Sequence, residues 1–481
     1  MSKDNEDKNT LDHIEYIEKR YKIFKFYKKF LASILNKSNY YVCLNKKGNI
    51  NLLDYFKKIE RIGSKSKFGD VYKLCLINKD ILKKNENFKS SLITRNKNKI
   101  KLSKLLKGSC VSVKLIPLEE DSFYNKENTK YDVWREIKAM ELVTKLVRKW
   151  NCQNFSMMYG YFVCNNCSYN NPELASSSKM CLLVVTELSH SDLKNWLIER
   201  DEIITKSKQS TDLMTGIRYT NLINEWYNIF FQIFSSIYLL QKKHQLIHND
   251  LHWGNILIDK IKAGGYWVYI INGITYYLPN LGFIIKISDF GKCTSITNFQ
   301  FNQKDMRDMN KILVNNKSVY QYNKSIDIKK ISNIYNWINS SADIKNKEIL
   351  PKEFYYLLQI IKNEPYITPI IVIKKYMIQF LHNKIGKKIS EKDQKNMETN
   401  NKIIDYRVGE IVGFKNHDVL IYALVSKIVD VHVLLIINKD KHKEIIASMH
   451  DVYKFKNKVE QDLENKKYKY LKEKKLGVFI M

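Results

Sequence analysis

Residues 248–255 have the sequence HNDLHWGN and are followed by the apolar run ILI at 256–258. The stretch falls between a predicted long helix and a predicted short strand. In so short a loop Asp250 and Asn255 stay close together. Asp250 can accept a hydrogen bond from an incoming hydroxyl group, and Asn255 can turn back to hold a metal ion. A polar turn that carries Asp and Asn by chance is the alternative, but the spacing H-x-D-x-x-x-x-N is too specific to favour it.

Apolar periodicity along the rest of the chain predicts both helices and strands. The helix before the loop is the strongest example, since its apolar side chains fall on one stripe: Leu222, Trp226, Ile229, Phe230, Ile233, Ile237 and Leu240. Further helices are expected at 11–36, at 131–149 and over most of 305–385. Strands are expected at 58–76, 110–118, 180–188, 256–258, 266–271 and 283–288, and again as several short strands over 408–456.

A carboxylate and a glycine follow the predicted strand at 283–288. Asp289-Phe290-Gly291 places an oxygen ligand of the kind that Mg²⁺ prefers at the end of this strand. The glycine lets the backbone act as a hinge. Such a triplet is common by chance, but here it lies downstream of the loop that carries Asp250 and Asn255.

The turn at 62–71, IGSKSKFGDV, contains two glycines between two predicted strands. Small residues let backbone amides approach phosphate groups, and Val71 can cover an adenine ring. Lys114 points inward from the strand at 110–118, and Glu136 lies on the helix that follows. We interpret the two as an ion pair that steadies phosphates; an exposed lysine and a solvated glutamate are the alternative.

These four patterns, in this order, resemble the protein kinase superfamily over about 55–385. The resemblance implies an α+β fold with two lobes, with ATP and Mg²⁺ as cofactors. It implies transfer of the γ-phosphate to serine or threonine hydroxyls of protein substrates. The catalytic residues it implies are Asp250, Lys114, Glu136 and His248, and the Mg²⁺ ligands are Asn255 and Asp289. The nucleotide-binding residues are Ile62, Gly63, Ser64, Gly69, Val71, Lys114, the gatekeeper Thr186, the hinge residues Glu187 to Ser189, and Leu257 below the adenine.

Departures from the common kinase pattern narrow the resemblance. Asn249 stands where Arg is usual, and His252 stands where serine/threonine kinases usually carry a phosphate-contacting Lys. A hairpin-like insertion at 265–282 precedes Asp289, and the segment after Gly291 is short. HxDLHWGN with such an insertion looks like haspin-type kinases. The whole set looks most like the serine/threonine kinases of large nucleocytoplasmic DNA viruses.

The composition is strongly basic, with 81 Lys and Arg against 50 Asp and Glu and a formal charge of +31. Weak binding of polyanions or nucleic acid at low salt is therefore expected. Because the Lys residues are spread along the chain and Gly and Pro are scarce, biased base composition is the favoured cause. No transmembrane segment and no secretory signal are expected. The eight Cys are predicted to be reduced thiols of a cytosolic protein.

The patterns divide the chain into six parts. These are a basic helical extension at 1–50, an N-lobe at 51–188 with a Lys-rich insertion at 78–109, a C-lobe at 189–385 with a hairpin insertion at 261–285, a linker at 386–404, a small β-barrel-like module at 405–460 and a basic tail at 461–481. Cys164 and Cys167 have the spacing of half a zinc site, but a hairpin turn with two thiols is the favoured interpretation. The module looks faintly like Tudor- or chromo-type domains.

Two other functions remain open from the sequence. Choline- and aminoglycoside-type kinases share the Asp250/Asn255 spacing but typically lack the Phe-Gly after the metal-binding Asp. A catalytically silent pseudokinase scaffold is the second, and the complete set of core residues argues against it. The resemblance implies a monomer that acts on protein substrates in the cytoplasm of an infected cell, with packaging in virions as a further option.

Overall fold

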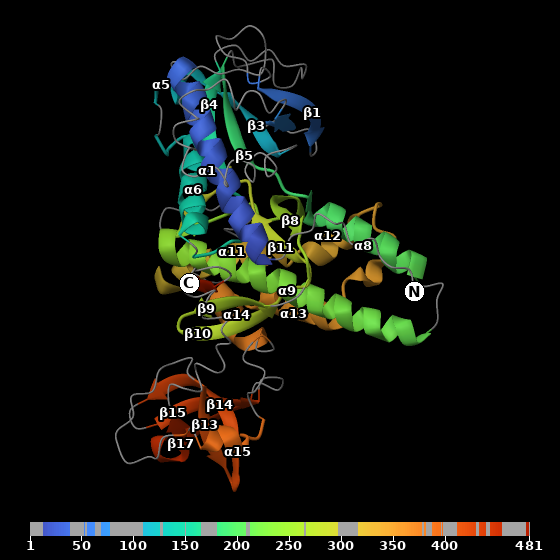
Figure 1. Ribbon diagram of the computed structural model, residues 1–481, viewed down its shortest axis with the longest axis vertical. Helices are drawn as coiled ribbons and strands as arrows, with labels where there is room; N and C mark the ends of the chain where they lie inside the picture. Colours follow the sequence, from blue (N-terminus) through green and yellow to red (C-terminus); the bar gives the residue numbers. More distant parts are fainter. Residues whose placement is uncertain are drawn as a thin grey trace, which may run out of the picture.

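A computed structural model of the chain gives the fold. It describes residues 13–38, 52, 55–62, 69–76, 109–125, 128–149, 151–164, 180–207, 212–263, 266–296, 316–377, 380, 387–395, 397, 411–429, 432–438, 443–454 and 478–480. The fold mixes helix and sheet, as predicted, and a sheet-rich part lies above a helix-rich part in Figure 1.

The sheet-rich part is built on one antiparallel five-stranded sheet. Its strands are β1 (Phe56–Ile62), β2 (Asp70–Leu76), β3 (Cys110–Leu118), β4 (Met158–Cys164) and β5 (Met180–Glu187), in the order β1-β2-β3-β5-β4. Side chains alternate along β3, where Val111, Val113 and Leu115 are fully buried and the residues between them are half-exposed. This alternation gives the sheet one core face and one face that is open to a ligand.

Two helices cover the sheet: α1 (His13–Ser38) and α6 (Asp132–Arg148). The predicted N-terminal helix is thus confirmed, and it packs on the protein core. Tyr27 of α1 stacks on Tyr159 of β4, with 5.1 Å between the ring centroids. Leu31 lies against Gly160 of the same strand, where a larger residue would contact it. The apolar stripe of α1 is therefore used to dock the helix on the sheet.

The helix-rich part centres on α9 (Asp212–His244). The predicted stripe of α9 is confirmed, because all seven of its side chains are buried in the main core. The other helices of this part are α8 (Leu193–Ser207), α11 (Asn316–Ile331), α12 (Ile334–Ser340), α13 (Lys352–Asn363) and α14 (Pro369–Tyr376). Short strands between them are β6 (Ser191–Asp192), β7 (Leu246–Ile247), β8 (Ile256–Lys260), β11 (Phe283–Ile287) and β12 (Thr294–Ser295). The short helix α5 (Glu120–Tyr124) follows β3 and lies in the sheet-rich part.

The predicted hairpin insertion is present as β9 (Tyr266–Ile271) and β10 (Ile274–Pro279). Its two-residue turn, Asn272-Gly273, has both residues at positive φ, which is the geometry that Asn-Gly favours in tight hairpins. A third strand, β18 (Val478–Ile480), lies parallel to β9 on its other edge. The far end of the chain therefore pairs with the insertion.

The predicted β-rich module forms a second five-stranded sheet in the order β16-β15-β14-β13-β17. Its strands are β13 (Ile411–Asn416), β14 (Val419–Val429), β15 (His432–Asn438), β16 (Lys443–Ser448) and β17 (Val452–Lys454). Part of the predicted linker belongs to this module. Ile389 is buried against Tyr422, and α15 (Glu391–Gln394) follows it.

The prediction that all cysteines are reduced is wrong for at least four of them. Cys75 and Cys110 form a disulfide between β2 and β3, and Cys164 and Cys181 are also disulfide-bonded. Cys75 and Cys110 lie at matching positions of adjacent antiparallel strands, where the Cβ atoms come close enough for a bridge. Since Cys164 is disulfide-bonded, its thiol is not available to bind zinc.

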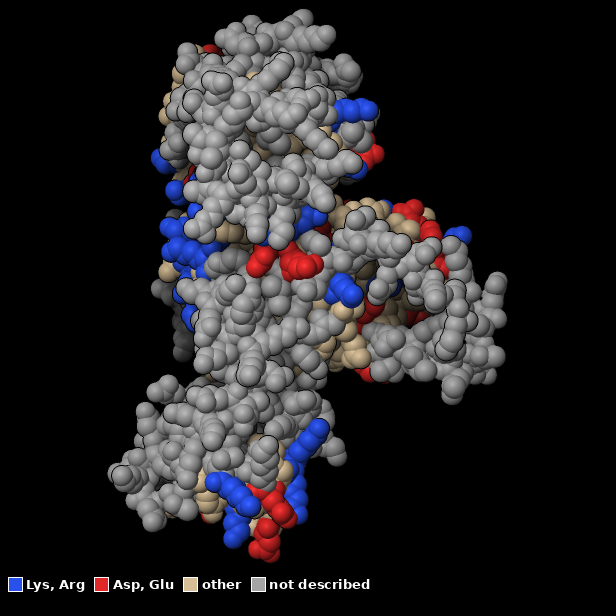
Figure 2. Space-filling view, viewed as in Figure 1, with Lys and Arg blue, Asp and Glu red and all other residues tan. Residues whose placement is uncertain are grey.

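Positive charge is gathered unevenly on the described surface. Lys and Arg side chains line the edge that α6 occupies in Figure 1, as Figure 2 shows. Lys145 and Arg148 lie in the last turn of α6, where the helix dipole favours positively charged side chains. Among the helices that the structure describes, none has the length and apolar character needed to cross a membrane.

Candidate active site

The loop at 248–255 is held from two sides. From below, Asp327 of α11 accepts hydrogen bonds from the backbone N–H groups of His248 and Asn249, at 2.9 and 2.8 Å. From the side, His248 Nε2 lies 2.9 Å from the carbonyl oxygen of Ser288, just before Asp289. Asn249 has φ of 60°, a conformation that Asn tolerates better than most residues. The loop therefore has a fixed shape before any ligand binds.

Asp327 is a residue that the sequence did not reveal. Asp327 is fully buried, and burial raises the pKa of its carboxyl group. The charge of His248 and the hydrogen bonds from the backbone of His248 and Asn249 lower this pKa in part. Its partners are 78 and 79 positions away in sequence. No local spacing marks such a residue; a lone Asp on the buried face of a helix was the available signal.

Asp250 and Asn255 lie together as predicted. The Asn255 side-chain amide donates to the Asp250 carbonyl oxygen at 2.9 Å, which fixes the orientation of the amide group. The Asp250 carboxylate has a partner that the sequence did not suggest, because Lys292 Nζ lies 2.9 Å from its Oδ1. This ion pair is partly exposed, so the carboxylate is accessible from solvent.

Asn255 and Asp289 could hold a magnesium ion. Ser288 donates from its backbone N to the Asn255 carbonyl oxygen at 3.0 Å, so the two candidate ligands lie on adjoining segments. Oδ1 of Asp289 accepts from Lys114 and from the Gly291 N–H, at 2.8 and 3.2 Å. Oδ2 of Asp289 and the Asn255 amide oxygen are the hard oxygen donors that suit Mg²⁺.

Lys114 lies between two carboxylates. Its Nζ is 2.8 Å from Glu136 Oε1 and 2.8 Å from Asp289 Oδ1. Burial favours a lower pKa for Lys114, but the two carboxylates outweigh it and raise the pKa above its ordinary value. Burial raises the pKa of Glu136, whereas Lys114 holds the pKa of Asp289 below its usual range despite burial. The predicted Lys114–Glu136 contact is present, and Asp289 joins it.

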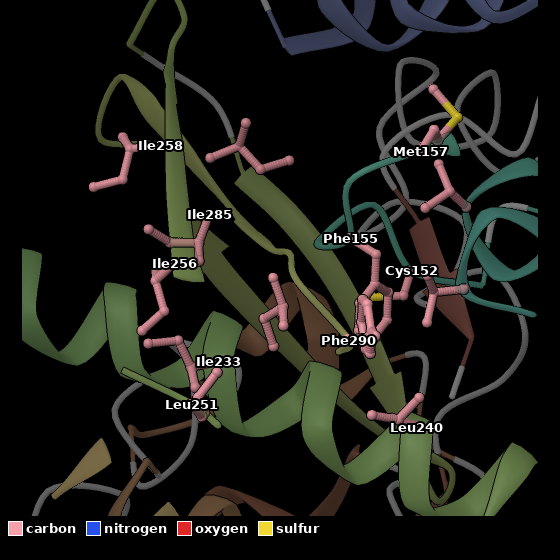
Figure 3. Packing of buried hydrophobic residues seen from close by; sticks show 14 of the residues in the cluster. Cys152, Phe155, Met157, Ile233, Leu240, Leu251, Ile256, Ile258, Ile285 and Phe290 are labelled. Carbon is pink, nitrogen blue, oxygen red and sulfur yellow. The ribbon is translucent and has the colours of Figure 1, made fainter. Parts of the chain in front are cut away.

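Phe290 anchors the segment that carries Asp289. Its ring is fully buried, 4.9 Å from the His248 ring and 6.3 Å from the Phe155 ring. Figure 3 shows Phe290 and Phe155 side by side. With Phe290 turned into the core, the neighbouring Asp289 faces Lys114, as φ of 59° at Asp289 allows.

One face of the five-stranded sheet carries the predicted nucleotide contacts. Strand register places Ile62 beside Val71, and Val71 beside Lys114. Thr186 falls on the same face, opposite Ser112. All of these side chains are only partly buried, so the face is open. Since neighbouring positions in adjacent strands share a face, the arrangement follows from the pairing alone.

Three further predicted contacts fit a nucleotide. Gly69 has φ of 145°, and a Cβ there would collide with the Leu115 carbonyl oxygen, so this turn needs glycine. Ser189 Oγ is buried without a hydrogen-bond partner among the described residues, and a ligand could supply one. Leu257 is half-buried on β8. Gly63 and Ser64 lie outside the described residues.

Glu187 does not face the nucleotide side. It lies on the opposite face of β5 from Thr186, because side chains alternate along a strand. There it forms a buried bidentate ion pair with Arg20 of α1, with N–O distances of 2.7 and 2.8 Å. Any contact of residue 187 with a nucleotide would therefore be through its backbone.

A second ion pair completes this buried cluster. Lys286, which is fully buried, lies 2.7 Å from Asp259 and 3.3 Å from Glu187. Tyr16 of α1 donates its hydroxyl to Asp259 as well. Two cations thus balance two carboxylates behind the hinge, which is what lets these charges stay buried. We name Tyr16, Arg20, Glu187, Asp259 and Lys286 the hinge cluster.

Residues 294–296, which follow Gly291 closely, are held by the helix-rich part. Thr294 and Ser295 pair with Ile247 and Leu246 as a small antiparallel ladder. Ile296 donates to the Gln245 carbonyl oxygen at 2.8 Å. These contacts come from β7 and its flanks. Thr297 lies outside the described residues.

Comparisons with known proteins point to a kinase-like viral group. An uncharacterized protein of Acanthamoeba polyphaga mimivirus is 26% identical over 351 residues, covering 57% of this chain and 46% of that protein. A probable serine/threonine-protein kinase of Invertebrate iridescent virus 6 is 23% identical over 158 residues, covering 31% and 25%. A probable serine/threonine-protein kinase of Dictyostelium discoideum is 33% identical over 82 residues, covering 14% and 6%.

These similarities are partial. The chain spans less than half the length of each of these relatives. No protein-family model matches it. The comparisons therefore support a kinase-like function and a viral relationship.

Proposed function

We propose that this chain is an ATP- and Mg²⁺-dependent protein kinase that phosphorylates serine or threonine. The observation that carries the proposal is the position of Lys114, which contacts Glu136 and Asp289 at 2.8 Å each. All three are residues that the resemblance to protein kinases implies for the site. A cation held between two carboxylates at an open sheet face, close to a rigid Asp250/Asn255 loop, suits the handling of a polyphosphate.

Each group has a distinct part in the proposed reaction. Asp250 orients the substrate hydroxyl and takes its proton as the oxygen attacks the terminal phosphorus. The bond from that phosphorus to the leaving oxygen of ADP breaks in the same step. Lys114 holds the phosphates, and Asn255 and Asp289 hold Mg²⁺, which when bound neutralises charge on the phosphates. Glu136 and His248 keep Lys114 and the loop in place.

The proposal extends to the whole chain. Residues 51–188 and 189–385 form the two lobes of the catalytic unit, and α1 is an extension fixed to both through the hinge cluster. The module at 405–460 is an accessory unit. The chain acts as a monomer on protein substrates. We place it in the cytoplasm of an infected cell or in the virion. Disulfides would favour the virion, because they persist in oxidising surroundings and are rare in the cytosol.

The experiment is phosphoryl transfer from radiolabelled ATP, with a basic protein, choline or an aminoglycoside as acceptor. We expect label on the protein, lost in Asp250→Asn and kept in Asp343→Asn, an exposed carboxylate paired with Lys194. Acid hydrolysis should release phosphoserine or phosphothreonine. Label on choline or the aminoglycoside instead would show that the chain is a small-molecule kinase. A folded protein that transfers no phosphate to any acceptor would indicate a catalytically silent pseudokinase scaffold.

A further inference from the structure

Phosphoryl transfer needs positive charge beside the oxygens of the moving phosphate. Lys114 is already shared between two carboxylates. At position 252, where the resembled kinases carry a lysine, the imidazole is turned back on its own loop. Its Nδ1 accepts from the Gly254 N–H at 3.1 Å. The loop itself therefore supplies no cation at the reacting end of Asp250.

Lys292 places a cation there from a different segment. Its Nζ lies 2.9 Å from Asp250 Oδ1, and its side chain is 54% exposed. Its backbone is fixed on both sides, since Phe290 and Cys293 are fully buried and Cys293 donates to the Phe290 carbonyl oxygen at 3.0 Å. A rigid base with an exposed, four-carbon arm suits a group that must follow a ligand.

We propose that Lys292 binds the terminal phosphate of the nucleotide during transfer, in the role that the loop leaves unfilled. The inference rests on the proposed function, because it needs a hydroxyl acceptor at Asp250. Without nucleotide the ammonium group neutralises Asp250. A phosphate that reaches the acceptor oxygen must come within a few ångströms of the same ammonium group. The ammonium group then moves from the Asp250 carboxylate to the phosphate. Asp250 is thereby free to take a proton from the hydroxyl.

A simple exposed ion pair is the competing explanation. Such pairs contribute about 0–1 kcal/mol to stability, and their loss changes little else. The two explanations differ in their effect on the rate. Removal of one preorganised donor to a transition state lowers kcat by about 10²–10³-fold. Removal of an exposed structural pair leaves kcat near its original value.

The test compares Lys292→Met, Lys292→Arg and the control Lys260→Met. Lys260 is also exposed and paired, 2.6 Å from Glu199 on the surface of the helix-rich part. We expect Lys292→Met to lower kcat by about 10²-fold or more with an unchanged melting temperature. Lys292→Arg should retain most of kcat, and Lys260→Met should match the unmodified protein.

Nucleotide affinity gives a second measurement that does not depend on turnover. Competition with a fluorescent nucleotide would yield the Kd for ATP and for ADP. We expect Lys292→Met to weaken ATP binding and leave ADP binding unchanged, because ADP lacks the phosphate in question. If neither kcat nor the ATP-to-ADP affinity ratio moves, the inference is wrong. The proposed function would survive that result, since it is judged by Asp250-dependent transfer in the unmodified chain.

Discussion

At the scale of single residues, Lys114 joins two carboxylates that would otherwise repel each other. Glu136 comes from α6 and Asp289 from the segment after β11, so one ammonium group ties three elements together. Glu136 is buried, and burial already raises its pKa. Without Lys114, protonation of Glu136 offers a way to relieve the remaining charge.

Lys114→Met should therefore abolish phosphoryl transfer and leave the protein folded. The loss in kcat is expected to reach several orders of magnitude, because the charge acts at the reacting centre. Steady-state transfer and circular dichroism would measure the two effects. Lys73→Met is the matched control, since Lys73 lies on β2 in an exposed pair with Glu60. Near-normal transfer by Lys114→Met would remove the mechanism.

At the scale of secondary-structure elements, α1 is attached to the rest of the fold through charge as well as apolar packing. Arg20 also donates to the carbonyl oxygens of Gln153 and Phe155. Breaking a buried pair from one side leaves an uncompensated charge, which costs about 3–5 kcal/mol. We expect Arg20→Met to lower the free energy of unfolding by this amount, measured by urea denaturation.

Lys22→Met supplies the comparison for Arg20→Met. Lys22 lies on the exposed side of the same helix, 3.5 Å from Glu18, and such pairs contribute only about 0.3–0.5 kcal/mol. A loss in Arg20→Met as small as that in Lys22→Met would show that the hinge cluster does not stabilise the fold.

The pH dependence of stability offers a separate check on the same pair. Burial alone would raise the pKa of Glu187, but Arg20 and Lys286 hold it below its ordinary value. A carboxylate with a lowered folded pKa stabilises the protein above its unfolded pKa, about 4.3, and this contribution is lost as the pH falls through the folded pKa. The stability gap between the unmodified protein and Arg20→Met should thus narrow on acidification, in urea titrations between pH 7 and 3.

The first residues after Gly291 are already ordered, since Thr294 and Ser295 pair with β7. Asn249 replaces the Arg that commonly clamps a phosphorylated loop, and Lys330 donates to its side-chain oxygen at 2.9 Å. Little entropy remains to be recovered by ordering these described residues. We expect protein made in bacteria and treated with phosphatase to be active, and a Thr294/Ser295/Thr297→Ala triple variant to keep that activity. Loss of activity in either case, with the fold intact, would contradict intrinsic activity.

Sequence reasoning succeeded where the signal is local. The stripe of α9 and the hairpin insertion at 265–282 were both predicted from residues that lie close together in sequence. The roles of Arg20 and Asp327 were not predicted, because their partners Glu187 and Asn249 lie 167 and 78 positions away in sequence. The disulfide between Cys75 and Cys110 was not predicted for a related reason, since strand register decides which cysteines meet. Glu187 was expected at the end of the strand at 180–188, which is β5. Alternation along that strand turns its side chain toward Arg20 and away from the face that carries Thr186.

At the scale of the whole molecule, β18 adds a parallel strand to the insertion hairpin. Deletion of residues 478–481 would leave the outer edge of β9 unpaired. We expect the β9 amides near Val268 and Ile270 to exchange hydrogen faster in that variant, with the β10 amides unchanged because β10 pairs with the other edge. Equal protection of β9 in both proteins would mean that this strand adds nothing to the sheet.

The pairing of β18 also decides how the module at 405–460 is attached. A domain joined by one linker can sample a wide sphere around its point of attachment. Here the chain leaves the helix-rich part after α14, builds the module and returns to β9, so the module is a closed loop with two anchors. Two anchors shrink the volume that it can explore. Anything that the module binds would be presented to the Asp250 region at a local concentration set by chain length rather than by supply from solution.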